Sequence, residues 1–163
     1  MSHTRNNLEA TRTRQECLAC KLNNDPSLVP GGRITETKFW IVEHCVGPFG
    51  IGSVILKTKE HKARFSECTQ SEVKEFASLL KLIHDTMEEV LQPEHIYVSR
   101  WGEDTPHLHF LIQPITQETK KKYQAHGPRL QAEMVESGEK PDPKKATQVA
   151  KKLKQWFIHH PSH

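Results

Sequence analysis

The stretch His107-Leu108-His109-Phe110-Leu111-Ile112-Gln113-Pro114 alternates in the way that predicts a β-strand, because successive side chains of a strand point to opposite faces. One face is apolar and consists of Leu108, Phe110 and Ile112. The other face carries His107, His109, Leu111 and Gln113. Two imidazoles on one face can bind a metal, or pair a nucleophile with a group that orients it. A lone strand histidine is more often a hydrogen-bonded core or surface residue, so other segments must decide between these readings.

The segments around this strand predict an antiparallel sheet with one long helix packed on it. Phe39-Trp40-Ile41-Val42 and Ser53-Val54-Ile55-Leu56 are β-rich runs on either side of a loop with Gly and Pro, which predicts a hairpin. Thr69-Gln70-Ser71-Glu72 has the spacing of a helix capping box, and apolar residues then recur at three- and four-residue steps up to Leu91. A strand over 96–100 follows. The order of two strands, a helix and two strands predicts an α+β fold.

The rest of the chain predicts three parts. Residues 1–14 are polar without periodicity and predict a disordered N-terminal tail. Residues 15–116 would form the α+β domain, with a loop-rich segment over 21–35. Residues 117–163 would form a C-terminal helical extension. It holds a helix over 120–136, a breaker over 138–143 and a basic amphipathic helix that ends near 158.

Composition excludes several classes of protein. The 163 residues suit one domain, and no apolar run is long enough to cross a bilayer or to act as a secretory signal. The formal charge of +3 comes from interspersed acidic and basic residues, which makes nucleic acid an unlikely partner. A cytoplasmic protein without membrane contact is expected. In that compartment the four cysteines stay reduced and need a reading other than disulfides.

Cys17-Leu18-Ala19-Cys20 supplies two thiols at the spacing of structural zinc sites. A redox pair is the main alternative, but such a pair normally begins a helix directly after a strand of a thioredoxin-like domain. Here the pair precedes a loop near the N-terminus. Zinc is therefore the favoured interpretation.

The sequence resembles the histidine triad (HIT) superfamily, whose signature is His-φ-His-φ-His-φ-φ-Pro with φ apolar. Residues 107–114 match it in register through the final proline, and the resemblance extends over roughly 17–114. It implies a HIT-like antiparallel sheet and, by analogy with bacterial zinc-containing members that resemble diadenosine polyphosphate hydrolases, a structural Zn²⁺. The ligands that the resemblance implies are Cys17, Cys20, His61 and His107.

The same resemblance implies that His109 is the nucleophile that attacks the α-phosphate of a nucleotide. This chain departs from the signature at Leu111, which replaces the third histidine and removes its general acid. We expect Gln113 to compensate in part by donating a hydrogen bond. The family pattern also differs at Ser53 and in the loop Glu103-Asp104-Thr105. The remaining residues expected to bind substrate are Arg100, Trp101, Ser53 and Thr105.

Three functions follow from these observations. The first is a nucleotide phosphohydrolase or nucleotidyl transferase, acting on a nucleotide or dinucleoside polyphosphate through a nucleotidyl-histidine. The second is a non-catalytic nucleotide-binding or regulatory HIT-like protein, which Leu111 and Ser53 permit. The third, a zinc-ordered nucleic-acid module, is disfavoured by the mixed charge. The resemblance also implies a homodimer.

Overall fold

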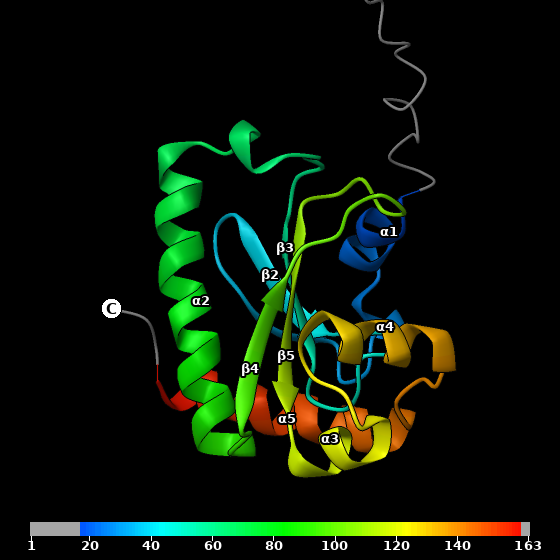
Figure 1. Ribbon diagram of the computed structural model, residues 1–163. Helices are drawn as coiled ribbons and strands as arrows, with labels where there is room; N and C mark the ends of the chain where they lie inside the picture. The colour runs from blue at the N-terminus through cyan, green and yellow to red at the C-terminus, as the bar shows by residue number, and fades with distance from the viewer. Residues whose placement is uncertain (1–16, 161–163) are drawn as a thin grey trace, which may run out of the picture.

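The structure, a computed structural model, describes residues 17–160, in which five antiparallel strands form one sheet in the order β1-β2-β3-β5-β4 (Figure 1). The strands are β1 (Arg33–Glu36), β2 (Trp40–His44), β3 (Val54–Thr58), β4 (His95–Ser99) and β5 (His109–Ile115). The helices are α1 (Leu18–Asn24), α2 (Gln70–Leu91), α3 (Gln117–Tyr123), α4 (Gly127–Ser137) and α5 (Pro143–His159). Two short 3₁₀ turns are η2 (Pro26–Leu28) and η3 (Phe65–Glu67). The predicted α+β class is confirmed, and the predicted tail lies outside the described residues.

The long helix α2 covers one face of the sheet, as the apolar periodicity predicts. It begins with the predicted capping box: the Thr69 side chain accepts from the Glu72 amide, and the Glu72 carboxylate accepts from the Thr69 amide. Leu79, Ile83 and Met87 of α2 are buried against the sheet. The helix α5 completes this core with Ala150 and Leu153. The C-terminal segment is therefore part of the main packing unit.

The opposite face of the sheet is covered by α1 and α4. There, Ile115 of β5 packs with Leu130 and Met134 of α4. The predicted single helix over 120–136 is wrong, because the chain breaks between α3 and α4. Gln124 adopts a left-handed φ of 47°, and Pro128 lies in the first turn of α4. A proline disfavours helical backbone at the residue before it and cannot donate a helical hydrogen bond, which explains a new helix start here.

The loop-rich prediction for 21–35 missed part of α1 and of β1. The helix α1 is short, and Cys17 caps it by accepting a bond from the Cys20 amide through its sulfur. The strand β1 is the edge partner of β2, and Ile34 is its only buried residue. No helix in the range 17–160 has both the length and the apolar character needed to span a membrane.

The hairpin loop between β2 and β3 requires glycine at position 52. Its φ of +86° is in the region that favours glycine, and a Cβ atom there would lie 2.8 Å from a Leu91 methyl carbon. Its amide donates to Nε2 of His44, which is completely buried at the end of β2. His44 is thus a buried structural residue that ties the two hairpin strands together.

Candidate functional site

Four potential metal ligands meet where α1, the segment after β3 and the start of β5 converge. The ligand atoms of Cys17, Cys20, His61 and His107 all lie within 4.8 Å of one another. The Sγ atom of Cys20 lies 3.3 Å from Nδ1 of His61 and 3.4 Å from Nδ1 of His107, and Cys17 Sγ lies 3.5 Å from the same His107 nitrogen. The four residues implied by the family resemblance are therefore brought together.

These distances fit a tetrahedral zinc site. With Zn–S bonds of about 2.3 Å and Zn–N bonds of about 2.0 to 2.1 Å, a tetrahedron places a sulfur and a nitrogen ligand about 3.5 Å apart. The three measured separations span 3.3 to 3.5 Å. Two thiolates with two imidazoles form a ligand set typical of structural zinc. When bound, the ion would complete a closed site that cross-links α1, the segment after β3 and the entry to β5, with no open position for catalysis.

His107 is held in the form that a metal requires. Its Nε2 lies 2.8 Å from the carbonyl oxygen of Thr58. Because a carbonyl only accepts, Nε2 carries the proton and the lone pair of Nδ1 faces the two sulfurs. Burial lowers the pKa of His107 to about 4, so the ring is neutral at physiological pH. A carbonyl that fixes the second nitrogen of a metal-binding imidazole is a common supporting contact.

A buried ion pair contacts the turn that contains Cys17 and Cys20, which is called the cysteine turn below. Nζ of Lys57 lies 2.5 Å from Oε1 of Glu43 and 3.3 Å from the carbonyl oxygen of Ala19, between the two cysteines. Both charged side chains are almost completely buried. Lys57 is also the cross-strand partner of His109, so one side chain connects the cysteine turn to the strand of the candidate nucleophile.

His109 is oriented by its own strand. Its Nδ1 lies 2.6 Å from the carbonyl oxygen of His107. By the same reasoning, the neutral ring carries its proton on Nδ1 and keeps a lone pair on Nε2, which is the nitrogen needed for nucleophilic attack. The ring lines a pocket of about 470 Å³. The histidines of the motif thus lie in different surroundings, His107 in the cluster of potential metal ligands and His109 in a pocket.

The pocket is formed by the loop before β5, the hairpin loop and α4. Trp101 and Thr105, two of the residues expected to bind substrate, line it together with His109. Phe49 contributes from the hairpin loop, and α4 contributes a wall that the motif could not indicate. That wall consists of Pro128, Gln131, Ala132, Val135 and Glu136.

Three predicted site residues do not line this pocket. Arg100 donates from Nη2 to the carbonyl oxygen of Ala63, at 2.6 Å. Ser53 is completely buried and donates to the carbonyl oxygen of Phe49, at 2.7 Å. Gln113 is also completely buried, and its Nε2 donates to the same carbonyl and to Met134 Sδ. The helix α4 packs over Gln113, which removes this side chain from the position where it would meet substrate.

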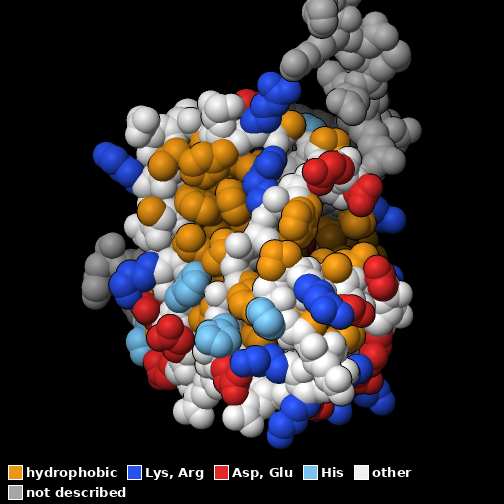
Figure 2. Space-filling model, viewed as in Figure 1, with side chains coloured by type: hydrophobic (Ala, Val, Ile, Leu, Met, Phe, Trp, Pro, Cys, Tyr) orange, Lys and Arg blue, Asp and Glu red, His pale blue; other side chains and the backbone are white. Residues whose placement is uncertain are grey.

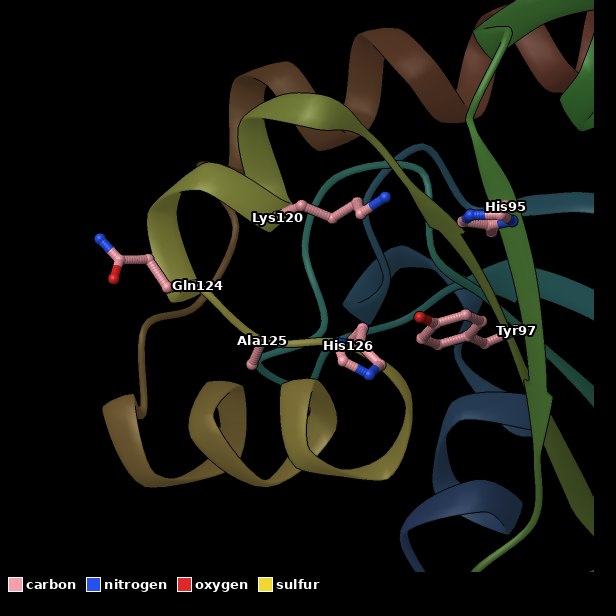
Figure 3. A pocket seen from close by; sticks show the side chains of 6 residues that line it. All are labelled: His95, Tyr97, Lys120, Gln124, Ala125 and His126. Atoms are coloured by element: carbon pink, nitrogen blue, oxygen red, sulfur yellow. The ribbon is translucent and has the colours of Figure 1, made fainter.

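Another pocket, of about 490 Å³, lies at the far end of β4 (Figure 3). His95 and Tyr97 of β4 face Lys120 of α3 and His126 of the following loop. None of its lining residues belongs to the motif of residues 107–114. We therefore place the candidate site at the pocket that contains His109.

Solved structures with the same fold are histidine triad proteins. A HIT-like protein from Bartonella henselae, described as involved in cell-cycle regulation, has a TM-score of 0.65 and 16% identity over 87% of this chain and 96% of that chain. A zinc-bound histidine triad protein from Mycobacterium smegmatis has a TM-score of 0.60 and 15% identity, with 90% and 96% covered. The diadenosine triphosphate hydrolase of Plasmodium falciparum has a TM-score of 0.59 and 13% identity, with 80% and 78% covered.

The sequence matches no protein-family model and no curated protein. The structural likeness nevertheless confirms the prediction made from residues 107–114: the chain has the histidine triad fold.

Proposed function

We propose that this protein is a cytoplasmic phosphohydrolase or nucleotidyl transferase that acts at the α-phosphate of a nucleotide or dinucleoside polyphosphate. The observation that carries the proposal is the orientation of His109. Its Nδ1 is committed to the His107 carbonyl, and its ring lines a pocket with Trp101 and Thr105. These residues supply a nucleophile, an indole that can stack on a base and a hydroxyl that can donate to phosphate.

The reaction would proceed in two displacements. Nε2 of His109 attacks the α-phosphorus, an N–P bond forms, and the bond from phosphorus to the departing group breaks with its electron pair leaving on that group. Water then attacks phosphorus, the N–P bond breaks, and the proton of water passes to solvent. In a transferase, an acceptor hydroxyl or phosphate would replace water. Zinc at the cysteine–histidine cluster would hold the fold and take no part in either step.

The nucleotidyl-histidine is the intermediate to detect. We expect that incubation with diadenosine triphosphate, diadenosine tetraphosphate, adenosine phosphoramidate or a nucleotide sugar gives a protein heavier by one nucleotidyl group. Intact-mass spectrometry after a neutral denaturing quench checks this, with the His109→Ala variant as the control that forms no adduct. Turnover without any adduct, at equal rates in both proteins, would exclude the proposed intermediate.

A non-catalytic nucleotide-binding role is the alternative, and Leu111 favours it. This residue occupies the position of the third histidine, is buried, and can neither donate nor accept a proton. Tight nucleotide binding by isothermal titration, with neither adduct nor product, would support the alternative over the enzyme.

We also propose that the protein forms a homodimer through β4. This strand is at the edge of the sheet, where unpaired backbone groups can pair with a second strand. Val98 on β4 is 43% exposed and is the cross-strand partner of Ile112. Nearby on the same face, the rings of Phe65, Phe76 and Phe110 contact one another. Figure 2 shows hydrophobic side chains gathered over this part of the molecule, beside the first half of α2.

The dimer proposal predicts that Val98→Asp gives a monomer, because a charge would then lie on the apolar face of the two joined strands. Light scattering coupled to size-exclusion chromatography measures the mass. Ile158→Asp is the matched control, since Ile158 is 58% exposed on α5 and should leave the dimer intact. A wild-type protein that is monomeric at all concentrations would contradict the proposal.

A further inference from the structure

A chain of hydrogen bonds runs from the hairpin loop through the sheet to the wall of the His109 pocket. The Phe49 carbonyl oxygen accepts from Nε2 of Gln113 at 3.0 Å. Oε1 of Gln113 in turn accepts from Nε2 of Gln131 at 3.0 Å, and the same Gln131 nitrogen donates to Ser99 Oγ at 3.0 Å. Two members of this chain line the pocket, Phe49 from the hairpin loop and Gln131 from α4.

The backbone carbonyl fixes the orientation of both amides. A side-chain amide is often ambiguous, because its oxygen and nitrogen are nearly the same size. Here Phe49 offers only an acceptor, so Gln113 must present Nε2 to it and Oε1 to Gln131. Gln131 must then present Nε2 to Gln113. Both hydrogens of Gln131 Nε2 are thereby used, one on Gln113 and one on Ser99.

Gln131, a residue of the pocket lining, is therefore left with Oε1 as an acceptor. Among residues 17–160, none donates a hydrogen bond to its Oε1 atom, and its side chain is fixed in place by the chain of bonds. A fixed acceptor that lines a binding pocket selects a ligand group that can donate, because an unpaired acceptor on the ligand would lose its hydration without compensation.

The charged residues around Gln131 also favour a ligand group that donates hydrogen bonds. Glu136 lies five residues further along α4, and Glu103 lines the pocket from the loop before β5. No described residue in the lining is Lys or Arg. The lone pair of His109 Nε2 adds one more acceptor. The other pocket differs in this respect, because it contains Lys120 and two histidines.

We propose that Gln131, Glu103 and Glu136 form a subsite for a positively charged, hydrogen-bond-donating group on the substrate, such as an amine. This inference rests on the proposed function, since it names the group that accompanies the nucleotide at the same site. The subsite selects a nucleotide joined to an ammonium-bearing group over one joined to further phosphates. Acceptors and carboxylates repel a polyphosphate and stabilise an ammonium.

Three matched ligands test the subsite by binding alone. AMP carries an N-(3-aminopropyl) group, an N-butyl group or an N-(2-carboxyethyl) group through a P–N bond, so that the tail is cationic, neutral or anionic. In the His109→Ala protein, which cannot form the adduct, isothermal titration should give an affinity about threefold to tenfold higher for the cationic than for the neutral ligand. The anionic ligand should bind least tightly.

The double variant Glu103→Gln/Glu136→Gln, made in the same His109→Ala protein, should abolish most of that preference. Both glutamates are exposed, so the change leaves folding intact. Glu133→Gln is the matched control: Glu133 is on the same helix, pairs with Arg129 and lies outside the pocket. Gln131→Met should weaken all ligands whose tails donate hydrogen bonds.

Equal affinity for the three ligands, tighter binding of the anionic ligand, or binding of none of them would overturn the subsite. Failure of the proposed function looks different. If the wild-type protein forms no adduct and no product from any of the three ligands, yet still prefers the cationic one, the subsite stands and the catalytic proposal falls.

Discussion

The Cys20→Ser variant is expected to lose its zinc and to unfold at a markedly lower temperature than the wild-type protein. Cys20 Sγ contacts both histidine ligands, so its removal opens the cluster at its centre. An ion that binds only the folded state stabilises it by about 4 kcal/mol when its concentration is 1,000 times its dissociation constant. For a chain of 163 residues this loss corresponds to a decrease in Tm of roughly 10 °C.

Metal analysis of the purified protein and thermal unfolding followed by circular dichroism measure the two effects. The matched control is Cys68→Ser, because Cys68 is half-buried beside η3 and lies outside the cluster. It should keep about one zinc ion per chain. A Cys20→Ser protein with wild-type zinc content and Tm would show that the four residues do not hold the metal.

The parts of the fold that could be predicted are those where local pattern and tertiary role agree. The capping box and the apolar repeat of α2 indicate the same helix, and the alternation of residues 107–114 indicates the strand β5. The strand β1 could not be found this way, because only Ile34 of its four residues is buried. Its strand conformation depends on pairing with β2, which is a contact with residues further along the chain.

One missed boundary did have a local signal. Gly127-Pro128 interrupts the predicted helix over 120–136, and glycine followed by proline commonly marks a break. The apolar and charged residues on either side suit a helix, which obscured that signal. The break matters for the site, because it allows α4 to turn back over the sheet and line the pocket.

The candidate site also has a part that could be predicted from local sequence and a part that depends on distant contacts. The spacing of Cys17 and Cys20 and the register of His107 and His109 are local. The structure brings Cys17, Cys20 and His107 into one cluster and places His109 at a pocket. The environment of Gln113 depends on α4, which no local pattern connects to it, and that of Ser53 depends on the hairpin loop. Both were expected near substrate because they lie on the correct face or beside the correct turn. Instead, Ser53 donates to the carbonyl oxygen of Phe49, to which Gln113 also donates, and Gln113 holds Gln131.

The two histidines are separated by one residue, and different carbonyl partners leave a different ring nitrogen of each with its lone pair. The Thr58 carbonyl accepts the hydrogen bond from Nε2 of His107 and leaves Nδ1 facing the two sulfurs. The His107 carbonyl accepts the hydrogen bond from Nδ1 of His109 and leaves the lone pair on Nε2. Zinc binding at His107 would therefore fix the carbonyl that orients His109, so loss of zinc should also reduce the reactivity of the candidate nucleophile.

The His109→Ala variant is expected to lower kcat by about 10⁴-fold or more, since removal of a covalent nucleophile abolishes the pathway through the intermediate. The cluster of four metal ligands does not include His109, so zinc content and Tm should stay at their wild-type values. Initial rates on the best substrate of the nucleotide panel measure the effect. His95→Ala is the matched control, because His95 is an exposed histidine on β4 that lines the other pocket. A His109→Ala protein that keeps the wild-type rate would remove this residue from the mechanism, and an equal loss in both variants would point to a general effect on the sheet. A loss confined to His109→Ala would connect the tautomer fixed by the His107 carbonyl to the chemistry of the pocket.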